Sequence, residues 1–241
     1  MKPNRKQRLY SSEMDLHKKI YIRLRILLAG RLVMLQRRLL ELALEEVGLH
    51  SQKLKITIDH INGRANVSGV EVGIVYPRQF FANAVNLPGE KMRDYYFNGA
   101  MPESGGRKQM LQPYVDRAES LIVSSIEGRN NRKKGQFNTD YYSGLRASRF
   151  TLCPHQADWP GPKETMWTYR FVEACIAKSI PIVFRETPLG DQFVNGFHFL
   201  WDDKEPHVYD EALAIKNRRL ALERFTLSAE QHSAILDKLE V

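Results

Sequence analysis

Polar and cationic side chains that could bind an anion follow a short apolar run in the middle of the chain. The run, Phe150-Thr151-Leu152-Cys153, stops at Pro154. A loop rich in Pro and Gly comes next and contains His155 and Lys163, and Arg170 follows in a helical pattern. The start of a helix presents N–H groups and the positive end of the helix dipole, and both attract phosphate groups. These residues indicate an anion site; the alternative is that His155 and Lys163 are solvated loop residues.

Three predicted elements position these residues. The run at 150–153 is typical of a strand, because Pro154 lacks the N–H that would continue a ladder. Apolar residues recur from Met166 to Ala177 as on a helix with a broad buried face, and Ile180 to Phe184 is almost continuously hydrophobic. Such a strand is expected in a parallel sheet covered by helices on both faces. Ligands of these sheets bind outside the carboxyl ends of the strands, which directs attention to Pro154 through Arg170.

The neighbouring segments continue the alternation of strands and helices. The expected strands and helices are, in order, a strand at Asp94–Phe97, a helix at Arg107–Ala118, a strand at Leu121–Ser124, a helix at Thr139–Ala147, an apolar run at Phe197–Trp201, and helices at Tyr209–Arg224 and Ser228–Leu239. This βαβα order predicts a Rossmann-like α/β domain with a parallel sheet.

Four stretches carry a family resemblance: Tyr95-Tyr96-Phe97-Asn98-Gly99, Ser148 to Pro154, Arg170 to Ala174, and Ile180 to Val183. Their order and spacing are similar to the patterns Y-F-x-G, S-x-F-x-L-x-P-x-G, R-x-x-E-A and G-x-x-P-V in the donor-binding half of exostosin-like glycosyltransferases. The resemblance covers roughly residues 93–202. The sequence departs from these patterns at two places: His155-Gln156 replaces a small residue and Gly, and Lys178 replaces a Gly.

The resemblance implies a GT-B fold and transfer of a sugar from a nucleotide sugar, with UDP or GDP as the nucleotide, to a glycan or another hydroxyl acceptor. It implies that Arg170 contacts the diphosphate and that Glu173 contacts the ribose hydroxyls. Pro154, His155 and Lys163 would lie at the same donor site. Members of this fold stabilise the leaving diphosphate with cations and a helix N-terminus, so neither a metal nor another cofactor is expected. The alternative is that Arg170 and Glu173 form a local helix pair at i, i+3, which contributes little free energy.

A candidate catalytic base lies near the N-terminus of the chain, where Asp59 and His60 follow an alternating, strand-like segment. An acceptor hydroxyl must lose a proton during transfer, and an inverting enzyme needs a base on the side opposite the leaving group. Arg170 would be the third catalytic residue. The alternative is a turn in which the Asp59 carboxylate caps backbone N–H groups.

The two cysteines, Cys153 and Cys175, both fall inside predicted core elements. Free thiols are therefore expected, as is usual in a reducing compartment. Cys153, His155 and Asp158 do not form a metal site, because no second Cys or His stands at ligand spacing. A nucleophilic role for Cys153 is equally unsupported, because nothing marks an adjacent activating group.

The chain of 241 residues is too short for two full nucleotide-binding folds. We expect a reduced N-terminal α/β part at residues 1–88, on the acceptor side, and a donor-binding domain at residues 89–241. Strands are predicted at Lys53–Asp59 and Val70–Tyr76 in the first part. Leu87 to Lys91 contains Pro88-Gly89 and is the expected linker.

The net charge of +8 comes from the N-terminal segment, where residues 1–38 hold eleven Lys and Arg residues against Glu13 and Asp15. Leu and Ile residues recur at three and four from Met14 to Val47, which predicts one long basic amphipathic helix, or two in tandem, with Gly48 as the stop. Such a helix could lie on an anionic membrane surface. The alternative is an ordinary helix that packs its Leu face on the core and leaves its cations in water.

No secretory signal or membrane span is expected, because Arg23, Arg25 and Arg31 interrupt the apolar stretch. The predicted location is cytoplasmic, with peripheral attachment to the inner face of a membrane. Two rival functions stay open. One is a non-catalytic glycosyltransferase-like subunit that needs a homodimer or a glycosyltransferase partner to complete a cleft. The other is a nucleic-acid-binding protein, which is disfavoured because its cations do not alternate with aromatic residues.

Overall fold

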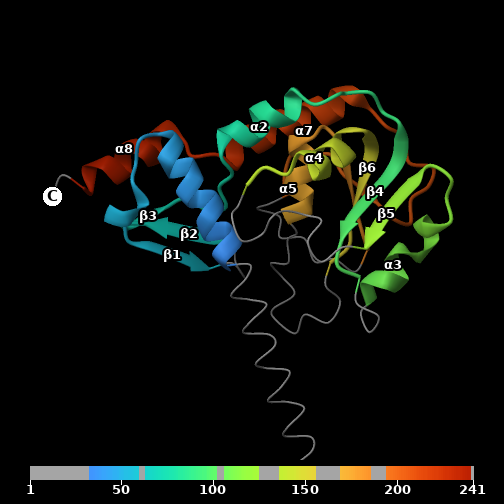
Figure 1. The fold of residues 1–241 in the computed structure, drawn as a ribbon, viewed down its shortest axis with the longest axis horizontal. Helices are drawn as coiled ribbons and strands as arrows, with labels where there is room; N and C mark the ends of the chain where they lie inside the picture. The colour runs from blue at the N-terminus through green and yellow to red at the C-terminus, as the bar shows by residue number, and fades with distance from the viewer. Residues whose placement is uncertain are drawn as a thin grey trace, which may run out of the picture.

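The computed structural model describes residues 33–59, 63–101, 106–124, 136–155, 169–185 and 194–239. These residues form a larger part built on a parallel sheet and a smaller part built on an antiparallel sheet (Figure 1). The predicted helix at Met14–Val47 is described only from residue 33, and it is helical there through residue 46.

The sheet of the larger part has the order β5-β4-β6-β7-β8, and all its pairings are parallel. Its strands are β4 (Arg93–Gly99), β5 (Ser120–Ser124), β6 (Ser148–Cys153), β7 (Ile180–Val183) and β8 (Leu200–Trp201). The first strand of this sheet in chain order is β4; β5 lies on one side of it and β6 on the other. The predicted parallel sheet is confirmed, with strand positions close to those expected from the apolar runs.

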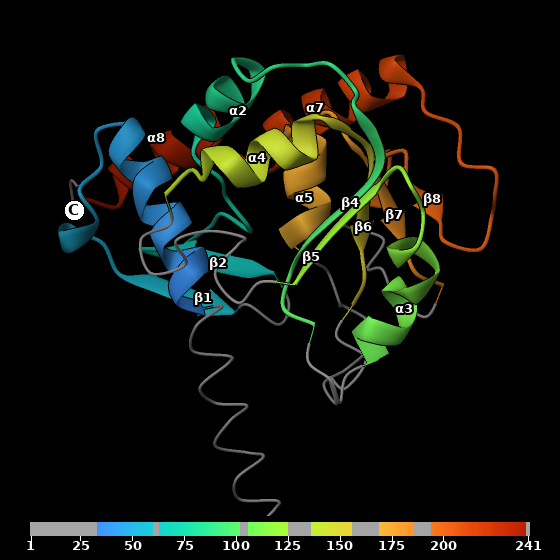
Figure 2. The same ribbon diagram turned by 45° about the vertical axis from the view of Figure 1, so that its right-hand side comes forward.

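Helices cover both faces of this sheet. On one face, Tyr95 and Phe97 share a core with Leu111 and Tyr114 of α3 (Gly106–Val115). On the other face, Tyr96 packs with side chains from α4 (Thr139–Arg146) and α5 (Tyr169–Ile176). Figure 2 shows α4 and α5 on one side of the sheet and α3 on the other. The alternation along β4 directs successive side chains to opposite faces, as the strand period of two requires.

The smaller part differs from the expected α/β part. It contains a 3-10 turn at Ser51–Lys53 and the antiparallel strands β1 (Ile56–Asp59), β2 (Arg64–Val67) and β3 (Val70–Glu71). The predicted strand at Val70–Tyr76 is wrong beyond Glu71, because the chain turns at Gly73, where φ is +67°. The short strand β2 was missed. It joins β3 through a two-residue turn with positive φ at Ser68 and Gly69, the geometry that suits a tight hairpin.

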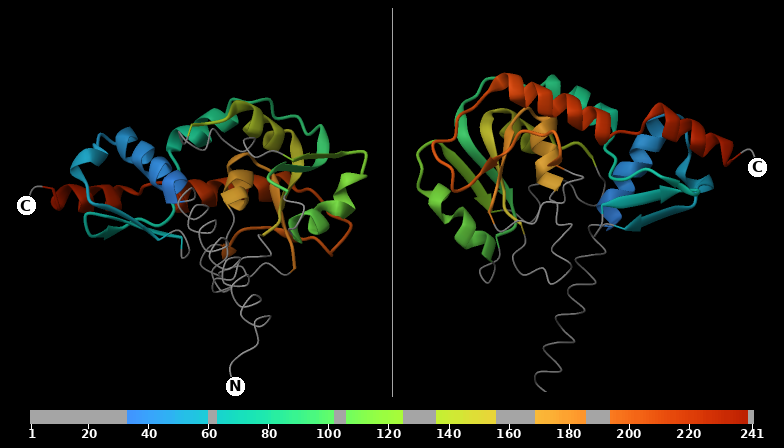
Figure 3. Two further views of the ribbon diagram at one scale, coloured as in Figure 1. Left: turned by 60° about the horizontal axis from the view of Figure 1, so that its bottom comes forward. Right: turned by 180° about the vertical axis from the view of Figure 1, so that it is seen from behind.

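The end of the chain returns to the smaller part. Helix α7 (Glu211–Arg224) packs on α5, and α8 (Ala229–Asp237) then packs on β3. Ile235 of α8 lies in one core with Leu40, Leu44 and Val67. Figure 3 shows the chain passing from α7 to α8 across the molecule. The division at residue 88 stays a prediction, and the packing adds that the C-terminal helix lies with the N-terminal elements.

A second contact joins the two parts at the start of α2 (Arg78–Val85), a helix that the sequence did not predict. Its N-cap residue is Pro77, which makes no side-chain cap. The Glu46 carboxylate accepts from the N–H groups of Arg78 at 2.7 Å and Gln79 at 2.9 Å. A carboxylate at a helix N-terminus satisfies N–H groups and complements the dipole, so Glu46 caps α2 from a distant position in the chain.

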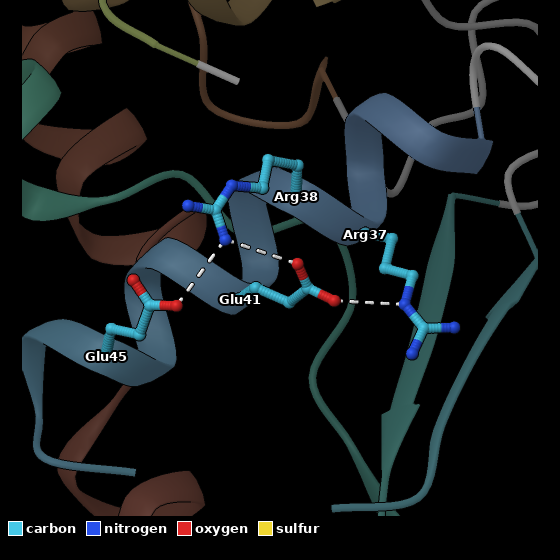
Figure 4. Close-up of polar contacts among 4 residues, drawn as sticks. All are labelled: Arg37, Arg38, Glu41 and Glu45. Atoms are coloured by element: carbon cyan, nitrogen blue, oxygen red, sulfur yellow. Dashed lines mark hydrogen bonds and ion pairs between the residues drawn. The ribbon is translucent and has the colours of Figure 1, made fainter. Parts of the chain in front are cut away.

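The helix at residues 33–46 buries Leu35, Leu39 and Leu40 and ends where Gly48 adopts a φ of +80°. Its exposed side carries ion pairs, which Figure 4 shows between Arg37, Arg38, Glu41 and Glu45. For these residues the interpretation as a helix packed on a core is confirmed. Within the described ranges, no helix is both long and apolar enough to span a bilayer.

Candidate anion site at the strand switch point

The two central strands diverge at their carboxyl ends. β4 pairs with β6 only as far as Tyr96, which stands opposite Thr151. Beyond that point β4 continues beside β5 to Gly99, and β6 continues beside β7 to Cys153. Among the described residues, residues 97–99 of β4 have no pairing partner on the side of β6, and this side is called the open edge of β4. In doubly wound sheets this reversal of strand order is the place where ligands bind.

Arg170 of α5 lies at this opening and is only 3% exposed. Its Nη2 donates to the main-chain oxygen of Asn98 at 3.2 Å, and its guanidinium carbon lies 4.5 Å from the centroid of the Phe97 ring. The second contact has cation–π geometry. A Cβ on Gly99 would lie 2.5 Å from Nη2, so the guanidinium occupies the space that a side chain at this position would take.

Glu173 lies one turn further along α5 and is 1% exposed. Its Oε2 accepts a hydrogen bond of 2.8 Å from the Tyr141 hydroxyl of α4. Arg170 and Glu173 thus contact different elements, β4 and α4. Each side chain thus contacts a residue far away in sequence, and the donor-binding roles of Arg170 and Glu173 stay predictions.

The remaining donor-side candidates lie at the end of β6 or outside the described residues. Pro154 and His155 directly follow β6, and both are buried. Lys163 falls outside the described residues. The structure therefore brings Arg170, Glu173, Pro154 and His155 to the carboxyl end of the parallel sheet.

The candidate base lies in the smaller part. Asp59 is exposed and ends β1, opposite Arg64 of β2, and His60 falls outside the described residues. In Figure 1 the β1 arrow runs toward the larger part. Asp59 thus belongs to a different sheet from the donor-side candidates, as a base on the acceptor side requires, and its catalytic role stays a prediction.

Sequence reasoning missed Asn98, which stands at the variable position of the Y-F-x-G pattern. Its Nδ2 donates to the Tyr96 hydroxyl at 3.3 Å, while its Oδ1 is buried and has no hydrogen-bond partner in the part of the chain that the structure describes. The signal available in the sequence was an Asn followed by Gly at the end of a predicted strand. Burial also raises the pKa of Tyr96, so its hydroxyl stays protonated at neutral pH.

The site combines the Arg170 guanidinium with the amide of Asn98, the hydroxyl of Tyr96 and the carboxyl group of Glu173. Cys153 and Cys175 are free and buried, and burial raises the pKa of the Cys175 thiol, which opposes reactivity. No group of His, Cys, Asp or Glu side chains suited to a metal ion occurs among the residues that the structure describes. A guanidinium is suited to phosphate, to which it donates in a planar fork.

The site can also be compared with known proteins. No model of a known protein family matches the chain, and no curated protein matches it. The exostosin-like resemblance therefore stays a prediction, which rests on the four sequence stretches.

Proposed function

We propose that the protein is a metal-independent glycosyltransferase of the GT-B type. It would move a sugar from a nucleoside diphosphate sugar, with UDP or GDP as the nucleotide, to a hydroxyl of a glycan or another acceptor. The observation that carries the proposal is the position of Arg170, which reaches the open edge of β4 where β4 and β6 diverge. A buried guanidinium at the switch point of a parallel sheet is suited to bind the diphosphate of a nucleotide.

In this proposal Arg170 binds the donor diphosphate and stabilises the negative charge that develops as it leaves. Glu173 accepts hydrogen bonds from the ribose hydroxyls. Its bond from Tyr141 is compatible with this role, because a carboxylate has two oxygens and about four acceptor positions. Pro154 and His155 form the wall of the donor site at the end of β6, and Lys163 would approach the same phosphates.

The acceptor side belongs to the smaller part. A base at Asp59 or His60 would take the proton of the acceptor hydroxyl, across from the donor site. The return of the chain to the smaller part through α8 supports a two-part arrangement, because the start and the end of the chain build this part together.

The alternative function is a non-catalytic glycosyltransferase-like subunit. One observation favours it: the described smaller part has a three-stranded antiparallel sheet, whereas a complete GT-B enzyme has a second parallel sheet. In that case the chain binds a nucleotide sugar but needs a homodimer or a glycosyltransferase partner for transfer.

Calorimetry with UDP, GDP and their sugar derivatives, in EDTA and in Mg²⁺, tests the proposal. We expect binding in EDTA, loss of binding in Arg170→Ala and native affinity in Arg219→Ala, whose side chain is on an exposed helix position. Binding that requires Mg²⁺ would contradict the metal-independent mechanism. Binding without transfer or donor hydrolysis, together with a monomeric state, would favour the partner-dependent subunit.

The proposed location is the cytoplasm, at an anionic membrane surface that residues 1–38 contact. Arg37 pairs with Glu41 at 3.0 Å, and Arg38 pairs with Glu41 and Glu45 at 3.4 Å each. The proposal therefore assigns the attraction to the cations earlier in the segment. Deleting residues 1–13 and reversing the charge of Lys18 and Lys19 by substitution with Glu should weaken vesicle binding. The expected loss is about 1 kcal/mol per lost cation near the surface. Arg37→Gln serves as the control, and equal binding to neutral and anionic vesicles would reject this location.

A further inference from the structure

Asn98 contributes both its main chain and its side chain to the switch point. Its main-chain oxygen accepts from Arg170, and the residue lies on the part of β4 that extends beyond the pairing with β6. Because side chains alternate along a strand, Asn98 shares the face of Tyr96, which is covered by α4 and α5. The amide thus lies on the same side of the sheet as the helix that carries Arg170.

The orientation of the amide is set by Tyr96. One end of the amide lies 3.3 Å from the Tyr96 hydroxyl, and the Tyr96 ring packs against Tyr141 and against Gly144. A Cβ on Gly144 would lie within 2.6 Å of this ring, which shows how closely α4 holds it. Since Tyr96 takes one end of the amide, the other end is left without a partner. That end is Oδ1, a buried acceptor.

We propose that Asn98 Oδ1 is a ligand-binding group that accepts a hydrogen bond from a hydroxyl or N–H of the bound molecule, next to the anionic group that Arg170 binds. The identity of that molecule as a nucleotide rests on the proposed function. A buried acceptor without a partner costs free energy in the folded protein, and such groups are rare outside sites where a ligand or water completes them. Asn98 carries both the main-chain oxygen that accepts from Arg170 and the Oδ1 that is unpartnered within the described ranges. The guanidinium and this acceptor are therefore both next to the same residue.

This arrangement selects a class of ligand. Arg170 alone would bind any phosphate or diphosphate, inorganic ions included. An acceptor beside it favours an organic phosphate that carries several hydrogen-bond donors close to the phosphate, such as the ribose hydroxyls, base N–H groups or sugar hydroxyls of a nucleotide sugar, over an inorganic ion whose donor is at most its own acidic proton. Asn98 would therefore distinguish the nucleotide from pyrophosphate.

The test measures the dissociation constants of UDP, GDP and pyrophosphate by calorimetry for the native protein, Asn98→Ala and Asn98→Leu. We expect about tenfold weaker binding of the nucleotide in both variants, as for the loss of one hydrogen bond, and less than about twofold change for pyrophosphate. Thermal unfolding is measured alongside. We expect only a small fall in the midpoint, from the loss of the Nδ2 bond to the Tyr96 hydroxyl, because Oδ1 has no partner among the described residues. The leucine variant keeps the side-chain volume in case the alanine variant fails to fold.

Each outcome separates this inference from the proposed function. If the native protein binds a nucleotide and both variants bind it equally well, a water molecule completes Oδ1, and the inference fails while the proposed function stands. An equal loss for pyrophosphate and nucleotide would overturn the inference too, because Asn98 would then act only by positioning Arg170. If the native protein binds none of the three compounds while Arg219→Ala and the native protein are both folded, the proposed function fails and the inference falls with it.

Discussion

Lys91 and Arg170 donate to main-chain oxygens at opposite ends of the same parallel sheet. Lys91 Nζ donates to Arg146 O at 2.9 Å and to Ser148 O and Lys178 O at 2.8 Å each. These oxygens lie at the end of α4, at the start of β6 and just before β7. Arg170 instead lies at the carboxyl ends of the strands, where β4 has an open edge.

The difference between the two cations lies in what surrounds them. An ammonium has three donors, and at Lys91 three carbonyl oxygens take them, including oxygens at the ends of two helices where a cation is favoured. Lys91 therefore joins three elements and has no donor left for a ligand. Arg170 lies beside the end of β4 that no longer pairs with β6, and beside Asn98 Oδ1, which has no partner among the described residues. A buried cation thus indicates a ligand site only when polar groups next to it have hydrogen-bonding positions that the described protein does not fill.

Substitution by Met should mainly weaken nucleotide binding at Arg170 and mainly lower the free energy of unfolding at Lys91. Arg170→Met keeps an unbranched side chain over Phe97 but removes the guanidinium. We expect nucleotide affinity to fall by at least about a hundredfold, as when a phosphate loses a charged partner. The free energy of unfolding should fall by less than in Lys91→Met, because one carbonyl oxygen loses its donor and not three. Calorimetry and urea unfolding measure the two quantities. A large loss of stability with native affinity would mean that Arg170 is a structural cation like Lys91.

Lys91→Met should leave nucleotide affinity within about twofold and lower the free energy of unfolding by about 3 kcal/mol, because three carbonyl oxygens lose their donor. Urea unfolding measures this loss. Lys178→Met is the matched control, since its main-chain oxygen would remain in place to accept from Lys91. A native unfolding free energy in Lys91→Met would show that these bonds contribute little.

The Lys91 contribution should also depend on pH. Burial lowers the pKa of Lys91 to about 7 from 10.5, while the three oxygens act in the opposite direction by favouring the charged form. With this lowered pKa, the unfolded chain binds more protons than the folded chain between pH 7 and 10.5. The stability of the native protein relative to Lys91→Met should therefore rise by about 1.4 kcal/mol per pH unit in that window and stay constant below it. A constant difference up to pH 10 would show that the three oxygens outweigh burial.

Gly99→Ala should displace the Arg170 guanidinium, because the new Cβ would lie 2.5 Å from Nη2. We expect about tenfold weaker binding of both UDP and pyrophosphate, since a misplaced cation affects every phosphate ligand. Gly89→Ala is the control: its Cβ would also meet an arginine, Arg146, but at the other end of the sheet. Native affinity in Gly99→Ala would show that Arg170 adapts without loss.

Tyr141→Phe removes the donor to Glu173 and should have the smallest effect. We expect about threefold weaker binding of nucleotides, no change for pyrophosphate, and a loss of about 1 kcal/mol in stability, because one buried hydrogen bond disappears. If pyrophosphate binding weakens equally, Glu173 acts on the phosphate end of the site and not on the ribose.

Some parts of this architecture could be read from the sequence because they depend on neighbouring residues. The apolar runs of β6 and β7 and the period of α5 identified a strand, helix and strand around Arg170 and Glu173. Local caps also delimit the last helices, since Asp210 and Ser228 accept from N–H groups three residues later in α7 and α8. The expected parallel sheet followed from the order of these elements.

Other features depend on residues far apart in the chain, and only the tertiary structure decided them. Helix α2 was missed because its cap, Glu46, is 32 residues away from Arg78. Asn98 and Arg170 are 72 residues apart, and their contact depends on which strands separate at the end of the sheet. Periodicity records which face of an element is buried but not which distant partner covers it. The sequence by itself therefore determined the strands and helices around the parallel sheet and the candidates Arg170 and Glu173. The tertiary structure decided where β4 and β6 separate and that Asn98 Oδ1 has no partner there among the described residues.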